Sequence, residues 1–392
     1  MSSRSSWLPG LVTWRVFFAG TAIFAAGTLF RGFFIQKPRA NVIESPRTTL
    51  LPKLSETEKS KLPYPPDVLP GARDVSTPYG SIRVYEFGPE NGRKVLLVHG
   101  ISTPCISLGA VAHCLAENGC RVMLFDLFGR GYSDTPADLE HDVRLFTTQI
   151  LLALASSPLS WTGASSGKFS MIGYSLGGGI SADFTSYFPE LVDSLILIAP
   201  AGLIRPYHIS RSSRIMYSQG VVPEAVLHRL IRGRLKRPLR PSKQPQPDGG
   251  EKMDATAAVQ AEANIESNPQ VPLSQSHPDI TVEKAVAHQV DHHGGFVHAF
   301  MSSIRYGPIQ DRHPSWRLIG QRLSQQSREK GTPHQVLIIG GDNDAIILKD
   351  ELQEDAAEAL EGNAEFRFIN AGHEVPISKG DEVAQYILQF WG

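Results

Sequence analysis

The sequence predicts an α/β fold in which a mostly parallel sheet is covered by helices on both faces. Short apolar runs of strand length, such as residues 121–125 and 194–198, alternate with amphipathic stretches of helical length, such as residues 139–154. Strands that alternate with helices in this way pair in parallel, because each helix carries the chain back across the sheet. At 392 residues, 41% of them hydrophobic, the chain can bury a substantial core and carry further segments.

The first 40 residues predict a membrane anchor or a targeting segment. An uninterrupted run of apolar and small residues extends over positions 16–30, with an arginine on either side. Such a run spans about 23 Å as a helix, short of a hydrocarbon layer of about 30 Å, so the expected span, residues 11–35, includes Arg31 as a snorkelling residue. We therefore expect membrane association through a single N-terminal pass. A mitochondrial presequence is the alternative, because no acidic residue precedes Glu44.

Residues 41–75 predict a linker, because six prolines interrupt a polar stretch there. We expect it to act as a tether for the folded domain. That domain then begins with two strand-like runs, residues 81–87 and 94–98, which flank the pair Asn91-Gly92. Asn-Gly favours a tight turn, so the two runs are predicted to pair as a hairpin.

The rest of the chain predicts one core in two parts. Residues 76–202 and 322–392 carry the alternating strands and helices, whereas the alternation stops in residues 203–321. We expect this middle segment to be a helical cap inserted over the site. Two histidines in it, His288 and His292, have helical i, i+4 spacing, but only one carboxylate accompanies them. We interpret them as packing residues of a cap helix and expect no metal site.

The most informative motif is Gly173-Tyr174-Ser175-Leu176-Gly177. It directly follows an apolar run and opens into a stretch that is competent to form a helix. A serine between two glycines at such a junction is typical of a nucleophile elbow, in which a sharp turn exposes the hydroxyl and the next backbone N–H. Elbows of this kind suit acyl transfer.

Two later loops offer partners for this serine in the expected order of acid and then base. Asp342 and Asp344 follow the apolar run at residues 335–339, and His373 follows the run at residues 366–369. Histidine titrates near neutrality, so it can take the serine proton and return it to a leaving group. Either carboxylate is available as the acid.

Together with two further segments, these motifs make the chain resemble an α/β-hydrolase fold serine hydrolase. Residues 94–101, with His99-Gly100 after a strand, are similar to the family's oxyanion strand and turn, and residues 125–134 resemble its glycine-rich loop. The resemblance implies Ser175 as nucleophile and His373 as base. The family's Gly-x-x-Asp spacing, counted from Gly341, favours Asp344 as the acid that orients the base, with Asp342 as the alternative. It also implies an oxyanion hole made by the backbone N–H groups of Ile101 and Leu176.

The expected function is hydrolysis of a carboxylic ester, apolar or lipid-like, through a covalent acyl-enzyme and without a cofactor. The order of anchor, elbow and cap resembles that of membrane-anchored monoacylglycerol lipases. Carbon–carbon bond hydrolases, acyltransferases and catalytically silent binding proteins of the same fold remain alternatives. A formal net charge of −1 provides no field that would attract nucleic acid, so the expected partner is a small-molecule ester.

Overall fold

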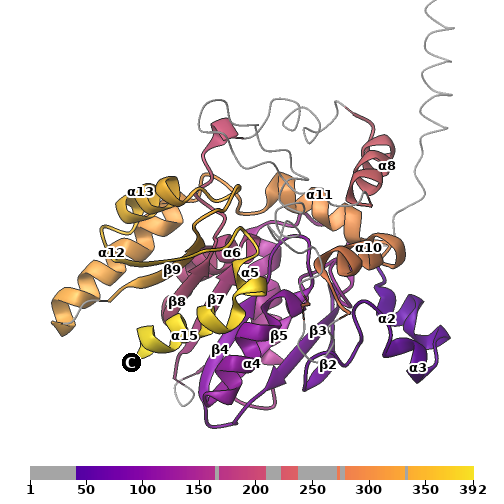
Figure 1. Cartoon of the computed structure of the whole chain (residues 1–392), viewed down its shortest axis with the longest axis horizontal. Helices are drawn as coiled ribbons and strands as arrows, with labels where there is room; N and C mark the ends of the chain where they lie inside the picture. The colour runs from indigo at the N-terminus through magenta and orange to yellow at the C-terminus, as the bar shows by residue number, and fades with distance from the viewer. Residues whose placement is uncertain (1–40, 164–166, 209–221, 237–271, 274–278, 332–333) are drawn as a thin grey trace, which may run out of the picture. The chain divides into compact units, whose positions relative to one another are not determined.

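The computed structural model describes residues 41–163, 167–208, 222–236, 272–273, 279–331 and 334–392 (Figure 1). The strands of the main sheet are β2 (Ala72–Thr77), β3 (Gly80–Phe87), β4 (Arg93–Val98), β5 (Cys120–Phe125), β7 (Phe169–Tyr174), β8 (Val192–Ile198), β9 (Val336–Gly341) and β10 (Ala364–Ile369). They form an eight-stranded sheet in the order β10-β9-β8-β7-β4-β5-β3-β2. β3 is antiparallel to both of its neighbours, β2 and β5, and the other neighbouring pairs of this sheet are parallel. The predicted α/β fold with a mostly parallel sheet is confirmed.

Helices flank this sheet on both faces. They are α4 (Gly109–Glu117), α5 (Val143–Ala155), α6 (Leu176–Tyr187), α12 (His313–Lys330), α13 (Lys349–Ala359) and α15 (Gly380–Trp391), with the short η2 (Cys105–Leu108) and α14 (Val375–Ser378) between them. The chain moves across the sheet in one direction from β4 to β5 and in the opposite direction from β5 to β7. Right-handed crossovers therefore place α4 on one face of the sheet and α5 on the other. In agreement, α4 packs against α15, whereas α6 packs against α5 and α12.

The centre of the sheet is the best buried part of the molecule. Every residue of β7 is buried, and so are the last four residues of β4 beside it. Strands covered on both faces need apolar side chains on both sides, which explains why these strands are continuous apolar runs rather than alternating ones. The carboxyl ends of β4 and β7 are therefore rigid platforms for the loops that follow them.

The predicted hairpin between residues 81–87 and 94–98 is wrong. In the structure β5 lies between β3 and β4, pairing antiparallel with the first and parallel with the second. The apolar β4 is thereby placed in the middle of the sheet. The hairpin partner of β3 is instead β2, which joins it through a tight connection at residues 78 and 79.

The stretch expected to be an open tether is packed against the domain from residue 41 onward. Its elements are β1 (Val42–Ile43), α2 (Pro46–Thr49), η1 (Leu51–Lys53) and α3 (Glu56–Lys59). β1 pairs antiparallel with β6 (Thr135–Pro136), and the Ser45 hydroxyl donates to the carbonyl of Tyr132 at 2.8 Å. Tyr64 is 1% exposed and donates to the buried carboxylate of Asp126 at 3.0 Å. Residues 41–70, here called the strap, are therefore packed against the domain and do not form a loose spacer.

Between β8 and β9 the described residues contain the 3-10 helix η3 (Pro206–His208) and three further helices before α12. These are α8 (Glu224–Leu235), α10 (Val282–His292) and α11 (Phe296–Tyr306), and α8 packs on both of the others. Figure 1 shows the three together at one end of the sheet. The next helix along the chain, α12, packs against α6 in the layer that covers the sheet.

The predicted anchor at residues 11–35 lies outside the described residues. Within the part that the structure does describe, none of the helices has the length and apolarity needed to cross a bilayer.

Candidate active site

Ser175 lies in a sharp turn between β7 and α6. Its backbone has φ +54° and ψ −121°, a conformation that residues with side chains rarely adopt and that costs about 1–3 kcal/mol. The flanking glycines permit the close packing around it. A Cβ on Gly173 would lie 2.3 Å from the carbonyl oxygen of Gly177, and one on Gly177 would lie 2.1 Å from that of Val98. The elbow geometry expected from the motif is present.

The serine, the histidine and the favoured carboxylate are joined by hydrogen bonds. His373 Nε2 lies 3.0 Å from Ser175 Oγ, and His373 Nδ1 lies 2.8 Å from Asp344 Oδ2. An ionised carboxylate only accepts, so Nδ1 carries the proton and Nε2 is free to accept from the serine hydroxyl. The three side chains are largely buried, at 6%, 1% and 5% exposed for Ser175, His373 and Asp344. Residues up to 198 positions apart in the chain thus form one connected line.

The two candidate carboxylates differ sharply in their surroundings. Asp344 Oδ1 accepts from the backbone N–H groups of Ile346 and Ile347, at 2.8 and 2.9 Å, which leaves Oδ2 for the histidine. Asp342 is exposed and its carboxylate pairs with Lys349 at 2.6 Å. The structure therefore places Asp344, and not Asp342, beside His373.

The two residues expected to provide backbone donors lie where neighbouring central strands end. Leu176 is the first residue of α6, so its N–H is one of the unpaired donors of a helix N-terminus. Ile101 follows β4, and the carbonyl of the preceding Gly100 is 2.9 Å from His99 Nδ1. His99 Nε2 accepts from the N–H of Leu127, so Nδ1 carries the proton that the Gly100 carbonyl accepts. In a trans peptide the Ile101 N–H then points away from that ring.

Burial keeps the His99 ring neutral, as this arrangement requires. The pKa of His99 is lowered to about 3, first by burial and then by the positive charge of Arg130. The ring therefore acts as a fixed donor and acceptor rather than as a proton carrier.

Two residues beside the histidine were not singled out from the sequence. The Tyr174 hydroxyl donates to the backbone carbonyl of His373 at 3.0 Å and so holds the histidine loop against the elbow. Glu374 is 3% exposed, its Oε1 accepts from the N–H of Gly372, and burial raises its pKa. Tyr174 occupies the variable position before the motif serine, where no spacing rule marks it.

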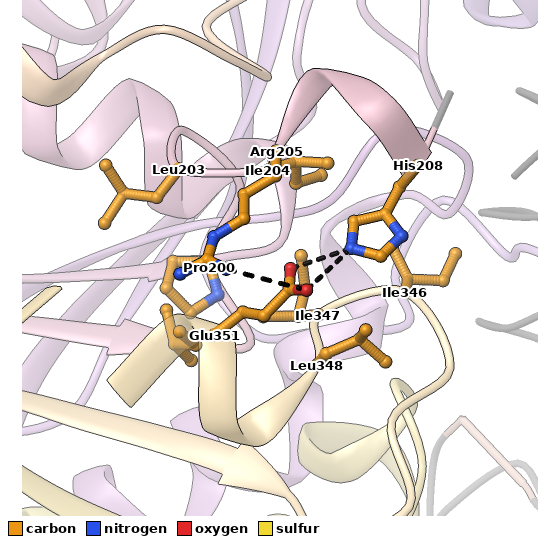
Figure 2. A pocket seen from close by; sticks show the side chains of 10 residues that line it. Pro200, Leu203, Ile204, Arg205, His208, Ile346, Ile347, Leu348 and Glu351 are labelled. Atoms are coloured by element: carbon orange, nitrogen blue, oxygen red, sulfur yellow. Dashed lines mark hydrogen bonds and ion pairs between the residues drawn. The ribbon is translucent and has the colours of Figure 1, made fainter. Parts of the chain in front are cut away.

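A small, half-open hollow lies beside the loop after β9 (Figure 2). Its lining is mostly apolar and comes from the segment after β8, the acid loop and α13; the residues are Pro200, Leu203, Ile204, Arg205, His208, Ile346, Ile347, Leu348, Glu351 and Leu352. Figure 2 shows Glu351 between Arg205 and His208, and the imidazole Nε2 of His208 lies 2.8 Å from its carboxylate. Since Ile346 and Ile347 also hold Asp344, the hollow and the acid share one loop.

The two histidines of α10 differ in burial: His288 is buried and His292 is exposed. The rings of His288 and His292 lie 4.8 Å apart, and burial, followed by the nearby His292, lowers the pKa of His288 to about 4. Over the described ranges, no three His, Cys, Asp or Glu side chains come together in a group that could hold a metal ion.

Comparison with known proteins places this geometry in a family. A family model described as alpha/beta hydrolase fold matches residues 94–379. The chain belongs to the alpha/beta hydrolase fold family. The matched residues include the elbow, the acid loop and the histidine loop.

Curated relatives match over shorter segments. An uncharacterized protein of Mycobacterium tuberculosis is 29% identical over 143 residues, which cover 36% of this chain and 39% of that protein. A serine hydrolase-like protein of Danio rerio is 27% identical over 131 residues, or 33% of this chain and 38% of that protein. The chain thus matches about two fifths of the length of these relatives.

Solved structures share the fold. A membrane phospholipase A superposes with a TM-score of 0.55 at 20% identity, covering 96% of this chain and 98% of that one. An enol-lactonase from Burkholderia xenovorans superposes with a TM-score of 0.54 at 13% identity, covering 81% and 99%. At these identities the likeness concerns architecture alone.

Proposed function

We propose that the protein is a serine hydrolase that cleaves a carboxylic ester through an acyl-enzyme on Ser175, His373 and Asp344. The observation that carries the proposal is the unbroken hydrogen-bonded line from Asp344 through His373 to the hydroxyl at the strained elbow. A buried serine at an ordinary turn would have no need of a base and an acid in this order.

The chemistry follows from these contacts. His373 Nε2 takes the Ser175 proton as Oγ attacks the ester carbonyl carbon, and the N–H groups of Ile101 and Leu176 stabilise the oxyanion that forms. When the carbon–oxygen bond breaks, the alcohol leaves with the proton from His373. Water then attacks the acyl group by the same route in reverse and restores the free serine. Asp344 stabilises the imidazolium in both steps.

An apolar or lipid-like ester is the proposed substrate class. Support comes from the mostly apolar hollow behind the acid turn and from the apolar N-terminal run, which we propose to anchor the chain to a membrane through residues 11–35. An anchored enzyme meets its substrate at the bilayer, where apolar esters are concentrated. Neither the chemistry nor the lining of the site calls for a cofactor.

A panel of p-nitrophenyl esters of rising acyl length tests the reaction and the substrate class. Wild type should hydrolyse the panel with kcat/KM rising with acyl length, whereas Ser175→Ala should fall by more than about 10³-fold. Ser186→Ala, which changes a buried serine of the helix α6 that follows the elbow, is the control and should retain activity. No turnover by wild type contradicts the hydrolase, and equal kcat/KM for acetyl and long acyl esters contradicts the apolar preference.

Filling the hollow tests its part in the preference. Ile204→Trp should lower kcat/KM for long acyl esters about tenfold or more, because a bulky ring removes the space, and should leave acetyl esters within about threefold. Leu318→Trp, at a position of α12 that is 45% exposed, is the control. An equal loss of kcat/KM for both acyl lengths would mean that the hollow does not bind the acyl chain.

A further inference from the structure

We infer that the cap helices α10 and α11 hold the oxyanion loop, here meaning residues 100–103, through Gln289 and Ser303, so that the seated cap fixes where the Ile101 N–H lies. The inference rests on the proposed function for its catalytic consequence. Its structural part concerns the loop alone and is tested separately below.

Three successive carbonyls of the oxyanion loop are each bound by a buried side chain. Besides the Gly100 carbonyl bound by His99, the Ile101 carbonyl accepts from Arg130 Nε at 3.1 Å, and the Ser102 carbonyl accepts from Gln289 Nε2 at 2.8 Å. All three donors are at most 1% exposed. Binding every consecutive carbonyl removes the freedom of each peptide to rotate, and this includes the peptide that carries the Ile101 N–H.

Two of these three contacts lead to the cap. Gln289 belongs to α10, and its Oε1 accepts from the N–H of Gly131 at 2.8 Å, so one amide joins the cap helix to two loops of the core. Arg130 donates through a terminal nitrogen to Ser303 Oγ of α11 at 2.8 Å, while its Nε holds the Ile101 carbonyl. α10 therefore contacts the oxyanion loop directly, and α11 reaches it through Arg130, in both cases through buried polar groups.

These contacts bear on catalysis because an oxyanion donor acts only at a defined distance. The donor nitrogen must lie about 2.7–3.1 Å from the developing oxyanion, and losing one such donor typically costs about 10²- to 10³-fold in kcat. If Gln289 is removed, the Ser102 carbonyl loses this donor, and the loop is held less tightly. Gln289 is on this argument a positioning residue and not a catalytic one.

The chain offers a matched control in Gln149. It is also fully buried and also makes one accepted and one donated bond to backbone, with the N–H of Phe128 and the carbonyl of Asp126, both at 3.0 Å. It contacts the glycine-rich loop but no carbonyl of the oxyanion loop. Gln289→Leu and Gln149→Leu therefore lose the same kind of bonds, and only the first loses the bond to residue 102.

Hydrogen–deuterium exchange of the full-length protein and ester kinetics together test the inference. Gln289→Leu should speed amide exchange of residues 101–103 at least about tenfold and lower kcat about 10- to 100-fold with KM within about threefold. Gln149→Leu should leave loop exchange unchanged and kcat within about threefold. Unchanged loop exchange in Gln289→Leu, or an equal fall of kcat in both variants, overturns the inference. Failure of wild type to turn over any ester overturns the proposed function instead, and the exchange comparison then decides the structural part by itself.

Discussion

At the scale of single residues, the site depends on which of two carboxylates in the loop after β9 contacts His373. Asp344 turns inward because two backbone N–H groups hold one of its oxygens, whereas Asp342 faces solvent and pairs with Lys349. The resemblance to the family's Gly-x-x-Asp spacing, counted from Gly341, favoured the carboxylate that the structure places beside His373. Tyr174 was not predicted, since its contact with the His373 carbonyl crosses 199 positions.

Replacing each carboxylate by its amide separates their roles. Asp344→Asn should lower kcat about 10³- to 10⁴-fold, because its amide oxygen would stay with the N–H groups of Ile346 and Ile347. Its NH₂ group would then donate to His373 Nδ1 and hold the wrong tautomer. Asp342→Asn, which loses only an exposed ion pair, should stay within about threefold. Steady-state kinetics on a p-nitrophenyl ester measures both, and equal losses would argue that the acid is not Asp344.

At the scale of elements, the sequence predicted where the strands and the loops after them lie in the chain. It predicted less well which strands and segments pack beside one another. The apolar runs of β4, β7, β8 and β9 are local signals, and the structure contains a strand at each. The pairing of β3 with β5 and the burial of the strap depend on contacts between distant segments, such as Tyr64 with Asp126, which no local pattern reports. Gln289 illustrates the same limit, because its partner Ser102 lies 187 positions away.

The packed strap predicts a stability cost at a residue that a tether would not need. Burial already raises the pKa of Asp126, and Tyr64→Phe removes a hydrogen-bond donor from its carboxylate. The substitution should lower the free energy of unfolding by about 1–3 kcal/mol. Tyr207→Phe also removes a phenol–carboxylate bond, to Glu351, but the tyrosine is 55% exposed, so it should cost less than about 0.5 kcal/mol. Urea denaturation distinguishes them, and equal stabilities would indicate a loosely held strap.

At the scale of the whole molecule, buried neutral histidines tie stability to pH. Burial is the first cause that lowers the pKa of His99 to about 3 and that of His293 to about 4. The His293 ring is fixed between the Ser133 carbonyl and the N–H of Gly295, where it joins the loop after α10 to the core. Protonating such rings requires opening the structure around them.

Acid should therefore destabilise the fold well above the range in which ordinary carboxylates titrate. The unfolded chain binds protons at histidines below about pH 6.5, while the folded chain excludes them down to about pH 4, so the free energy of unfolding falls as pH is lowered across this window. One such group contributes at most on the order of 3 kcal/mol. Thermal or urea unfolding at pH 7.5, 6.0, 5.0 and 4.5 measures the slope.

The variant His293→Gln separates the contribution of one histidine to the pH dependence of stability from the contribution of the carboxylates. It should be less stable than wild type at pH 7.5 but should lose less stability on acidification, because one proton-binding site of the unfolded chain is gone. An equal slope in both proteins would mean that His293 is not kept neutral by the fold.

The most direct measurement of the central claim is the identity of the residue that acts as the nucleophile. Wild type treated with a fluorophosphonate should carry one adduct, located by peptide mass spectrometry on Ser175. Ser175→Ala should carry none, and His373→Ala should react at least about 10²-fold more slowly. An adduct on another residue, or labelling that persists at the wild-type rate in both variants, would contradict a serine activated by His373 and Asp344.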